Sequence, residues 1–561
     1  MDMEDFRHRE QTTEEVHAVQ DAIIGNVKFA VECGFDAIEL NCSSDHMFDT
    51  FLSKFWNISR TDQYSAESLE NRARVVTEII RRIKEECGSD FPVQVLFNGV
   101  EENFLPLGDS SLCITPEEAQ EFAKLFEEAG ADSLHIRTSS FGNHCSGFMP
   151  DVMHFGEKGN TGLGGVVDYN VHFKGLVDGD HDGATAFLNV AAKIKEAVSI
   201  PVGTVGNMDP RLAEERINEA ISDGKIDFIM VNRPLLADPE LPNKLKEGRK
   251  DDIVPCNKCV SCFKAVADMW GIGYCRVNPA YIRGGTEEMP EGREPIPAET
   301  PKRVLVIGGG PAGMEAAAVA AQRGHQVMLY EKNQSLGGLI PLASAVKGKH
   351  DRMYEYSEFL QRRLDKLGVE IHLGETVDEA KVREIDPDAV LVAVGSSKPK
   401  TALTDHEGSN IYKDITLDFH KLGTEICIIG GDIIAYDYAA KLAGVGKRVT
   451  VISQRPEEEI GIEQSSWERA VVNGWMQAKG ARFRGKAEIK EIGDNEVVVV
   501  QPESPEERIR FDALFLLEDL QPNTELVEAL KDYNAVAIGD CERPFNILEA
   551  VKSGNLAARR V

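Results

Sequence analysis

The sequence predicts an α/β protein that combines an incomplete TIM (β/α) barrel, a cysteine-bearing connector and two Rossmann-like domains in tandem. Short apolar strands alternate with amphipathic helices through residues 1–250, a pattern typical of parallel strands joined by helices. Four closely spaced cysteines follow within residues 251–300. A strand–glycine turn–helix–strand pattern then occurs twice, which predicts one domain over 301–422 plus 530–561 and another over 423–529.

Composition narrows the class of protein. A chain of 561 residues is long enough for about three or four domains. Its 62 basic and 93 acidic residues give a formal net charge of −31, which disfavours nucleic acids and anionic membranes as partners. No basic-then-apolar leader and no run of about 18 apolar residues is present, so neither a signal peptide nor a membrane span is expected. Eleven cysteines without a disulfide-like rhythm favour a reducing cytoplasm.

The first region contains five strand candidates and helix-like segments between them. The strand candidates are Phe35–Leu40, Pro92–Phe97, Ser133–Ile136, Pro201–Val205 and Asp227–Val231. A helix is expected over Pro116–Glu128, with Thr115 as N-cap and Glu118 completing a capping box. Five strands are too few to close an eight-stranded barrel. We therefore expect either a partner that covers the open sheet or, as we favour, a sequence that is part of a longer chain.

The cysteines Cys256, Cys259, Cys262 and Cys275 have the spacing C-x2-C-x2-C-x12-C. Four thiolates so spaced can hold a [4Fe–4S] cluster, since each soft sulfur binds one iron. The same ligands also suit a structural Zn²⁺ ion. The uneven spacing is unlike a paired zinc knuckle and favours the cluster, although zinc stays an alternative.

The first glycine turn has the full dinucleotide-binding pattern. Residues 303–313 read RVLVIGGGPAG, so Gly308, Gly310 and Gly313 satisfy G-x-G-x-x-G directly after an apolar strand. Such a turn places a pyrophosphate at the N-terminus of the following helix. Glu331 follows about 20 residues later, where a carboxylate can bind ribose hydroxyls.

The second glycine turn is altered. Residues 425–435 read EICIIGGDIIA, which puts Asp432 at the position of the second glycine. A carboxylate there repels a pyrophosphate, and its Cβ hinders close approach, so we expect the fold to persist and leave nucleotide binding open. The next strand ends without an acid at the ribose position. If a nicotinamide cofactor binds, Arg455 favours NADPH over NADH.

Several long segments resemble one known family. They include AVECGFDAIELN, FLSKFWNISRTDQYSAESLENRAR, IPVGTVGNMDP and GDCERPFNILEAVKSGNLAA. Together with the order of the domains, they resemble the iron–sulfur branch of the Old Yellow Enzyme / NADH:flavin oxidoreductase family, which includes 2,4-dienoyl-CoA reductase, trimethylamine dehydrogenase and bile-acid enone reductase relatives. The first segment is similar to that family's fourth barrel strand, so the N-terminal barrel strands are lacking. The similarity extends over nearly the whole sequence.

The resemblance implies the cofactors FMN, a [4Fe–4S] cluster, FAD (or ADP in its place) and NADH or NADPH. The FMN phosphate would lie at Gly206, Asn207 and Arg233, although Arg233 also suits an ordinary surface ion pair. FAD would contact Gly338 and Asp540, the latter through its ribityl chain. Leu96 stands where the family usually has an arginine beside the flavin, which puts FMN occupancy or its redox potential in question.

The resemblance also implies catalytic residues. The family's substrate-anchoring pair corresponds to Asn41 and Ser44, of which Asn41 can still polarise a substrate carbonyl. His46 stands at the position of a tyrosine proton donor, and His144 lies near a histidine of the dienoyl reductase. Either could protonate the substrate, while a purely structural role is equally open for both. The Gly- and His-rich stretch Asp151–Asp182 is expected to shape a substrate pocket.

The leading functional prediction is NAD(P)H-dependent reduction of an activated C=C bond in an enoate, enone or enoyl thioester. One alternative is an amine dehydrogenase of the trimethylamine dehydrogenase type, which has the same cysteine spacing and an altered second nucleotide site. Another is an electron-transfer subunit or fragment without FMN catalysis, favoured by Leu96 and the missing strands. The expected partners are a small-molecule substrate and, at most, a second copy or a protein that completes the barrel.

Overall fold

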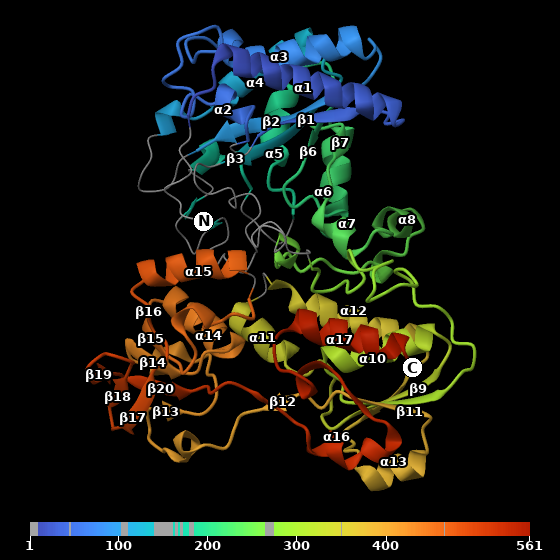
Figure 1. The fold of residues 1–561 in the computed structure, drawn as a ribbon, viewed down its shortest axis with the longest axis vertical. Coiled ribbons are helices and arrows are strands. Elements are labelled where there is room, and N and C mark those ends of the chain that lie inside the picture. The colour runs from blue at the N-terminus through green and yellow to red at the C-terminus, as the bar shows by residue number, and fades with distance from the viewer. Residues whose placement is uncertain are drawn as a thin grey trace. The chain divides into compact units, whose positions relative to one another are not determined.

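The computed structural model describes most of the chain in two compact units. The described residues are 9–43, 46–102, 110–139, 161–162, 167–168, 172–178, 184–263, 274–348, 351–464 and 466–561. The first unit extends through Val231, and the second begins at Asn232 and continues to Val561. Figure 1 shows both units as ribbons, with the first in blue to green and the second in green to red.

The first unit contains a five-stranded parallel sheet in the order β1-β2-β3-β6-β7. Its strands are β1 (Ile38–Cys42), β2 (Val93–Glu101), β3 (Ser133–Ser139), β6 (Val202–Thr204) and β7 (Phe228–Ile229). Each overlaps one of the five predicted strands, and the all-parallel order confirms the predicted βα pattern. The unit's helices include α1 (Thr13–Glu32), α2 (Asp49–Leu52), α3 (Leu69–Glu86), α4 (Pro116–Ala129), α5 (Leu188–Lys195) and α6 (Pro210–Ser222).

One face of this sheet packs against helices and the other carries polar residues. Leu40, Phe97 and Ile136 join a buried core with Val16 of α1 and Phe122 of α4. Figure 1 shows α1, α3 and α4 along this side of the sheet. The helix predicted after Thr115 is confirmed: α4 has the full capping box, so its first amides are satisfied locally.

The second unit begins with the connector and then forms the first Rossmann-like domain. Its parallel sheet has the order β10-β9-β8-β11-β22. The strands are β8 (Arg303–Ile307), β9 (Gln326–Glu331), β10 (Glu370–Leu373), β11 (Ala389–Val392) and β22 (Val536–Ala537). The helices α10 (Pro311–Gln322), α12 (Met353–Lys366) and α17 (Ile547–Arg559) contribute to its core. The C-terminal segment thus returns to the first domain, because β22 pairs with β11.

The second Rossmann-like domain has a parallel sheet in the order β13-β20-β14-β15-β16. Its elements are β13 (Ile411–Tyr412), β14 (Glu425–Ile429), α14 (Ile433–Gly444), β15 (Arg448–Ile452), β16 (Arg482–Arg484) and β20 (Ala513–Leu516). Both predicted strand–turn–helix–strand copies are therefore present. Among the described residues, no helix is both long and apolar enough to cross a membrane.

Candidate cofactor pocket and active-site residues

The first glycine turn brings α10 very close to β8 and β11. Gly308 has a positive φ of 108°, and a Cβ there would lie 2.3 Å from the carbonyl oxygen of Ala393. A Cβ on Gly313 would lie 1.9 Å from the carbonyl oxygen of Gly308. Neither position can accept a larger residue without moving the backbone. Gly310 is the N-cap of α10 and provides no side-chain cap, so the helix N-terminus is suited to an external anion.

Glu331 ends β9 beside this turn and is buried. Its carboxylate accepts hydrogen bonds from the backbone N–H of Gly309 (2.8 Å) and from the backbone and side-chain nitrogens of Asn333 (2.8 and 2.7 Å). These bonds hold the carboxylate at the position where Rossmann folds bind a ribose.

A cavity of about 730 Å³ adjoins the turn. Gly308, Gly310, Glu331, Gly338 and Asp540 line it, so the structure brings together the residues predicted to bind the first nucleotide. Gly313 lies beneath, where it permits the close packing of α10.

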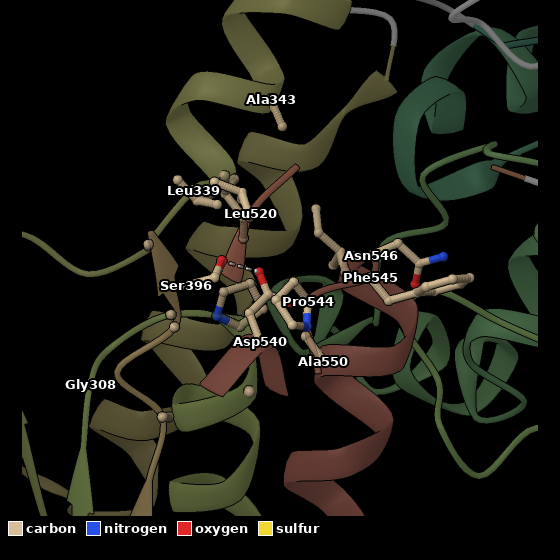
Figure 2. Close-up of a pocket in the computed structure, with 18 of the residues that line it drawn as sticks. Gly308, Leu339, Ala343, Ser396, Leu520, Asp540, Pro544, Phe545, Asn546 and Ala550 are labelled. Atoms are coloured by element: carbon tan, nitrogen blue, oxygen red, sulfur yellow. Dashed lines mark hydrogen bonds between the residues drawn. The ribbon is translucent and has the colours of Figure 1, made fainter. Parts of the chain in front are cut away.

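The C-terminal segment closes one side of the cavity, and sequence reasoning assigned only Asp540 of it. Figure 2 shows Pro544, Phe545 and Asn546 beside Asp540, which accepts a hydrogen bond from the Ser396 hydroxyl at 3.4 Å. Burial raises the pKa of Asp540. Asn546 caps α17, a role that a helix-capping pattern of Asn followed by Glu549 could have indicated.

The four connector cysteines line one small cavity together with Arg233 and Arg276. The chain turns sharply around them, with positive φ at Lys258 and Val260. The backbone N–H of Lys258 donates to the sulfur of Cys256 at 3.4 Å. Within the described residues, no group of three or more His, Cys, Asp or Glu side chains is arranged so that it could hold a metal ion.

The electrostatics of these thiols depend on what they bind. Burial, with the neighbouring charge of Cys259, raises the pKa of Cys262 to about 12. Burial also raises the pKa of Cys275. Bound iron or zinc would have to supply the positive charge that stabilises the thiolates. Arg276 lines this cavity and also the large one, so the two cavities share a wall.

Two of the residues predicted to act on a substrate, Asn41 and His46, lie at or just beyond the C-terminal end of β1 in the first unit. Asn41 is in β1, and its Oδ1 accepts a hydrogen bond from the Ser43 hydroxyl at 3.0 Å. His46 lies just before α2 and is exposed. Ser44 and His144 lie outside the described residues, as does most of Asp151–Asp182.

The predicted phosphate residues Gly206 and Asn207 form a turn after β6, with φ of 95° and 53°. A Cβ on Gly206 would meet the ring of Phe187 at 2.4 Å, so glycine is required there. The end of this strand is where (β/α) barrels commonly hold a phosphate. Arg233, the third predicted phosphate residue, belongs to the second unit and lines the cysteine cavity.

Sequence reasoning missed a His–Glu pair on the polar face of this sheet, in which His135 is buried and Glu39 is exposed. Leu96 pairs in register with Asn41 on one side and with His135 on the other. The Nδ1 of His135 lies 2.9 Å from Glu39, whose side chain shares this face because it is two residues before Asn41. No motif marked this pair, since its partners are 96 residues apart.

Comparison with known proteins agrees with this architecture. Residues 2–110 and 178–252 match the NADH:flavin oxidoreductase / NADH oxidase family, and residues 302–535 match the pyridine nucleotide-disulphide oxidoreductases. The NADH oxidase of Thermoanaerobacter brockii is 32% identical over 97% of this chain and 78% of its own length. The chain belongs to the NADH:flavin oxidoreductase / NADH oxidase family.

Two further proteins that resemble this chain support the family assignment. The cinnamate reductase of Clostridium sporogenes is 33% identical over 80% of this chain and 62% of that protein. The structure of a 2-naphthoyl-CoA reductase in complex with 2-naphthoyl-CoA has a TM-score of 0.79 and 26% identity, covering 99% of this chain and 77% of that one. The chain is therefore a flavin-dependent oxidoreductase built from a barrel-type and a Rossmann-type part, and flavins and NAD(P)H are the cofactors of the family to which it belongs.

The second glycine turn has Asp432 where the first has Gly310. Asp432 caps α14, and its Oδ1 accepts hydrogen bonds from the backbone N–H groups of Ile434 (3.0 Å) and Ala435 (3.1 Å). Burial raises the pKa of Asp432 to about 7; the hydrogen bond from Ala435 opposes this rise and the charge of Asp519 adds to it.

We predict that Gly310→Asp removes the nucleotide from the first Rossmann-like domain. The new carboxylate would cap α10 and repel a pyrophosphate, which should weaken binding by about tenfold or more. FAD and ADP released per chain measure the effect. Gly474→Asp in α15 (Ser466–Ala478) is the control, because it adds the same charge at a site with no atom within 4 Å of the new Cβ. Unchanged nucleotide content in Gly310→Asp would contradict the assignment.

We also predict a pH-dependent stability that depends on Asp432. Its pKa is raised to about 7 in the folded chain, so between its usual value of 3.8 and 7 the folded state binds more protons than the unfolded state. The free energy of unfolding should therefore fall as pH rises through this window. Urea denaturation midpoints of the wild type and Asp432→Asn across that range test this. The difference between the two proteins should change with pH, and a constant difference would refute the prediction.

Proposed function

We propose that this chain reduces a C=C bond conjugated to a carbonyl group, as in an enoate, an enone or an enoyl thioester. The observation that carries the proposal is the shared wall of two redox-type sites: Arg276 borders both the nucleotide cavity and the cavity of the four cysteines. Electrons can pass directly between cofactors held at such adjacent sites. The related cinnamate reductase and 2-naphthoyl-CoA reductase support an unsaturated carbonyl compound as the electron acceptor.

The residues of the second unit fit FAD and a [4Fe–4S] cluster. The uncapped N-terminus of α10 would hold the pyrophosphate, Glu331 the ribose and Asp540 the ribityl chain. The four thiols line one cavity, and their C-x2-C-x2-C-x12-C spacing suits a cluster in which each sulfur binds its own iron. Arg233 and Arg276 would offset part of the negative charge of four thiolates. Bound there, FAD and the cluster would supply electron transfer.

In the first unit, the turn at Gly206 and Asn207 fits an FMN phosphate, and bound FMN would supply hydride chemistry. Asn41 is oriented for a substrate carbonyl: because Ser43 donates to its Oδ1, its Nδ2 amino group is the end that can donate to the carbonyl oxygen. His46 is exposed beyond the same strand and would deliver a proton to the α-carbon. His144 is a second candidate for this proton transfer. A reducing compartment such as the cytoplasm suits the described cysteines, all of which are free thiols.

The proposal predicts which compounds reoxidise the enzyme. Holoenzyme reduced with dithionite under anaerobic conditions should be reoxidised by members of a panel of enoates, enones and enoyl thioesters, measured by the return of flavin absorbance. Asn41→Ala should slow that step by about 100-fold, the usual effect of removing one donor to a developing oxyanion. Asn26→Ala, on the exposed face of α1, is the matched control and should leave the rate unchanged.

Failure of every unsaturated compound to reoxidise the flavin would refute the reductase. Bleaching of the oxidised flavin by secondary or tertiary amines would instead favour an amine dehydrogenase. Holoenzyme that contains FAD and iron without FMN would favour an electron-transfer role.

A further inference from the structure

The two Rossmann-like domains form an internal comparison, because their glycine turns share one backbone conformation. Gly310 has φ −74° and ψ −179°, and Asp432 at the equivalent position has φ −78° and ψ −178°. Each is the N-cap of the helix that follows the first strand of its domain. The two turns therefore present the same helix N-terminus, and they differ in what lies in front of it.

In the second domain the side chain of Asp432 occupies the place of a pyrophosphate. Besides its bonds from Ile434 and Ala435, Asp432 accepts a hydrogen bond through Oδ2 from the backbone N–H of Leu520 at 3.3 Å. The N–H groups of Ile434 and Ala435 lie at the start of α14, where a bound pyrophosphate would accept hydrogen bonds. The helix dipole favours one anion at this point, and the chain supplies that anion itself.

A second carboxylate, that of Asp519, accepts hydrogen bonds from two other backbone N–H groups of the turn. Asp519 accepts hydrogen bonds from the backbone N–H of Gly431 at 2.8 Å and of Asp432 at 3.1 Å. Gly309 in the first turn likewise donates to an internal carboxylate, that of Glu331, so the second turn is distinguished by the Asp432 carboxylate at the helix N-terminus and by the hydrogen bond that the backbone N–H of Asp432 donates to Asp519. The large cavity reaches this turn, because Asp432, Ile434 and Arg455 also line it, so what opposes a dinucleotide here is the internal carboxylate and its hydrogen bonds rather than a lack of space.

Arg455 is engaged as well. The sequence favours it as a partner for the 2′-phosphate of NADPH, but its Nε donates to Asp519 at 2.5 Å and its Nη1 to Glu463 at 2.7 Å. The Glu463 side chain is only 4% exposed. When Asp432, Asp519, Glu463 and Arg455 are all ionised, their formal charges sum to −2, and this negative charge repels the pyrophosphate of NADH and of NADPH.

We propose that Asp432 and Asp519 determine the electron donor of this enzyme by excluding NADH and NADPH from the second Rossmann-like domain. The pyridine nucleotide that the family uses does not fit the second glycine turn of this chain, because Asp432 already accepts the hydrogen bonds at the helix N-terminus. The inference concerns the donor alone and is independent of the substrate that the barrel reduces. It predicts that the domain acquires affinity for pyridine nucleotides when the two carboxylates are removed.

The test measures nucleotide binding to the holoenzyme, whose first domain is filled by its own nucleotide. NADH and NADPH are titrated anaerobically by isothermal calorimetry into wild type and into Asp432→Gly/Asp519→Ala. Wild type should show no saturable binding below about 1 mM, and the double variant should bind at least about tenfold more tightly. Asp432→Asn/Asp519→Asn preserves the helix cap and should also gain affinity, although less, because its side chains still fill the turn.

Saturable binding of either nucleotide to wild type in the micromolar range would overturn the proposal. The proposal would also be overturned if both double variants kept their bound nucleotide, their iron and their circular dichroism spectrum and still bound NADH and NADPH no more tightly than wild type. Because calorimetry does not use the substrate, failure of the reductase assignment would leave this result unaffected. Conversely, if the donor proposal failed, an enone should still reoxidise the dithionite-reduced enzyme.

Discussion

The hydrogen-bonding capacity of a helix N-terminus is the constraint on which the chemistry of the second unit depends. A helix that begins directly after a parallel strand leaves backbone N–H groups that need an acceptor. In the first Rossmann-like domain the N-cap is Gly310, which has no side chain, so a bound ligand can accept these hydrogen bonds. Glu331 lies beside this turn and accepts a hydrogen bond from Gly309. In the second domain Asp432 and Asp519 meet the requirement internally. The same backbone conformation therefore leaves the helix N-terminus open to a ligand in one copy and caps it with the chain's own carboxylate in the other.

A buried group of charges ties the connector to both Rossmann-like domains. Arg276, next to Cys275, pairs with Asp351 at 2.5 Å, and Lys347 lies 3.2 Å from Asp437 and 3.5 Å from Glu468. Burial lowers the pKa of Lys347, but the charges of Asp437, Glu468 and Asp351 outweigh that effect and raise it overall. Such a buried network contributes little net stability, yet it is costly to disrupt in part. It holds Arg276 where the nucleotide cavity and the cysteine cavity meet.

Local sequence signals predicted much of this architecture. The strands could be located because each is a short apolar run between turn residues, and α4 because Thr115 and Glu118 form a capping box. The sequence also identified Asp432 as the altered position. It could not reveal Asp519, which follows Asp432 by 87 residues and reaches the turn only through the fold of β20 and the loop after it. Nor could it show that Arg455 is paired, since pairing depends on tertiary packing.

A crystal structure of the holoenzyme soaked with NADH tests the central claim most directly. The account predicts density for an adenine dinucleotide in the cavity beside Gly308 and Glu331. It also predicts that Asp432 and Asp519 keep their hydrogen bonds to the second turn, with no nucleotide density there. Density for NADH at the N-terminus of α14, with Asp432 displaced, would contradict it.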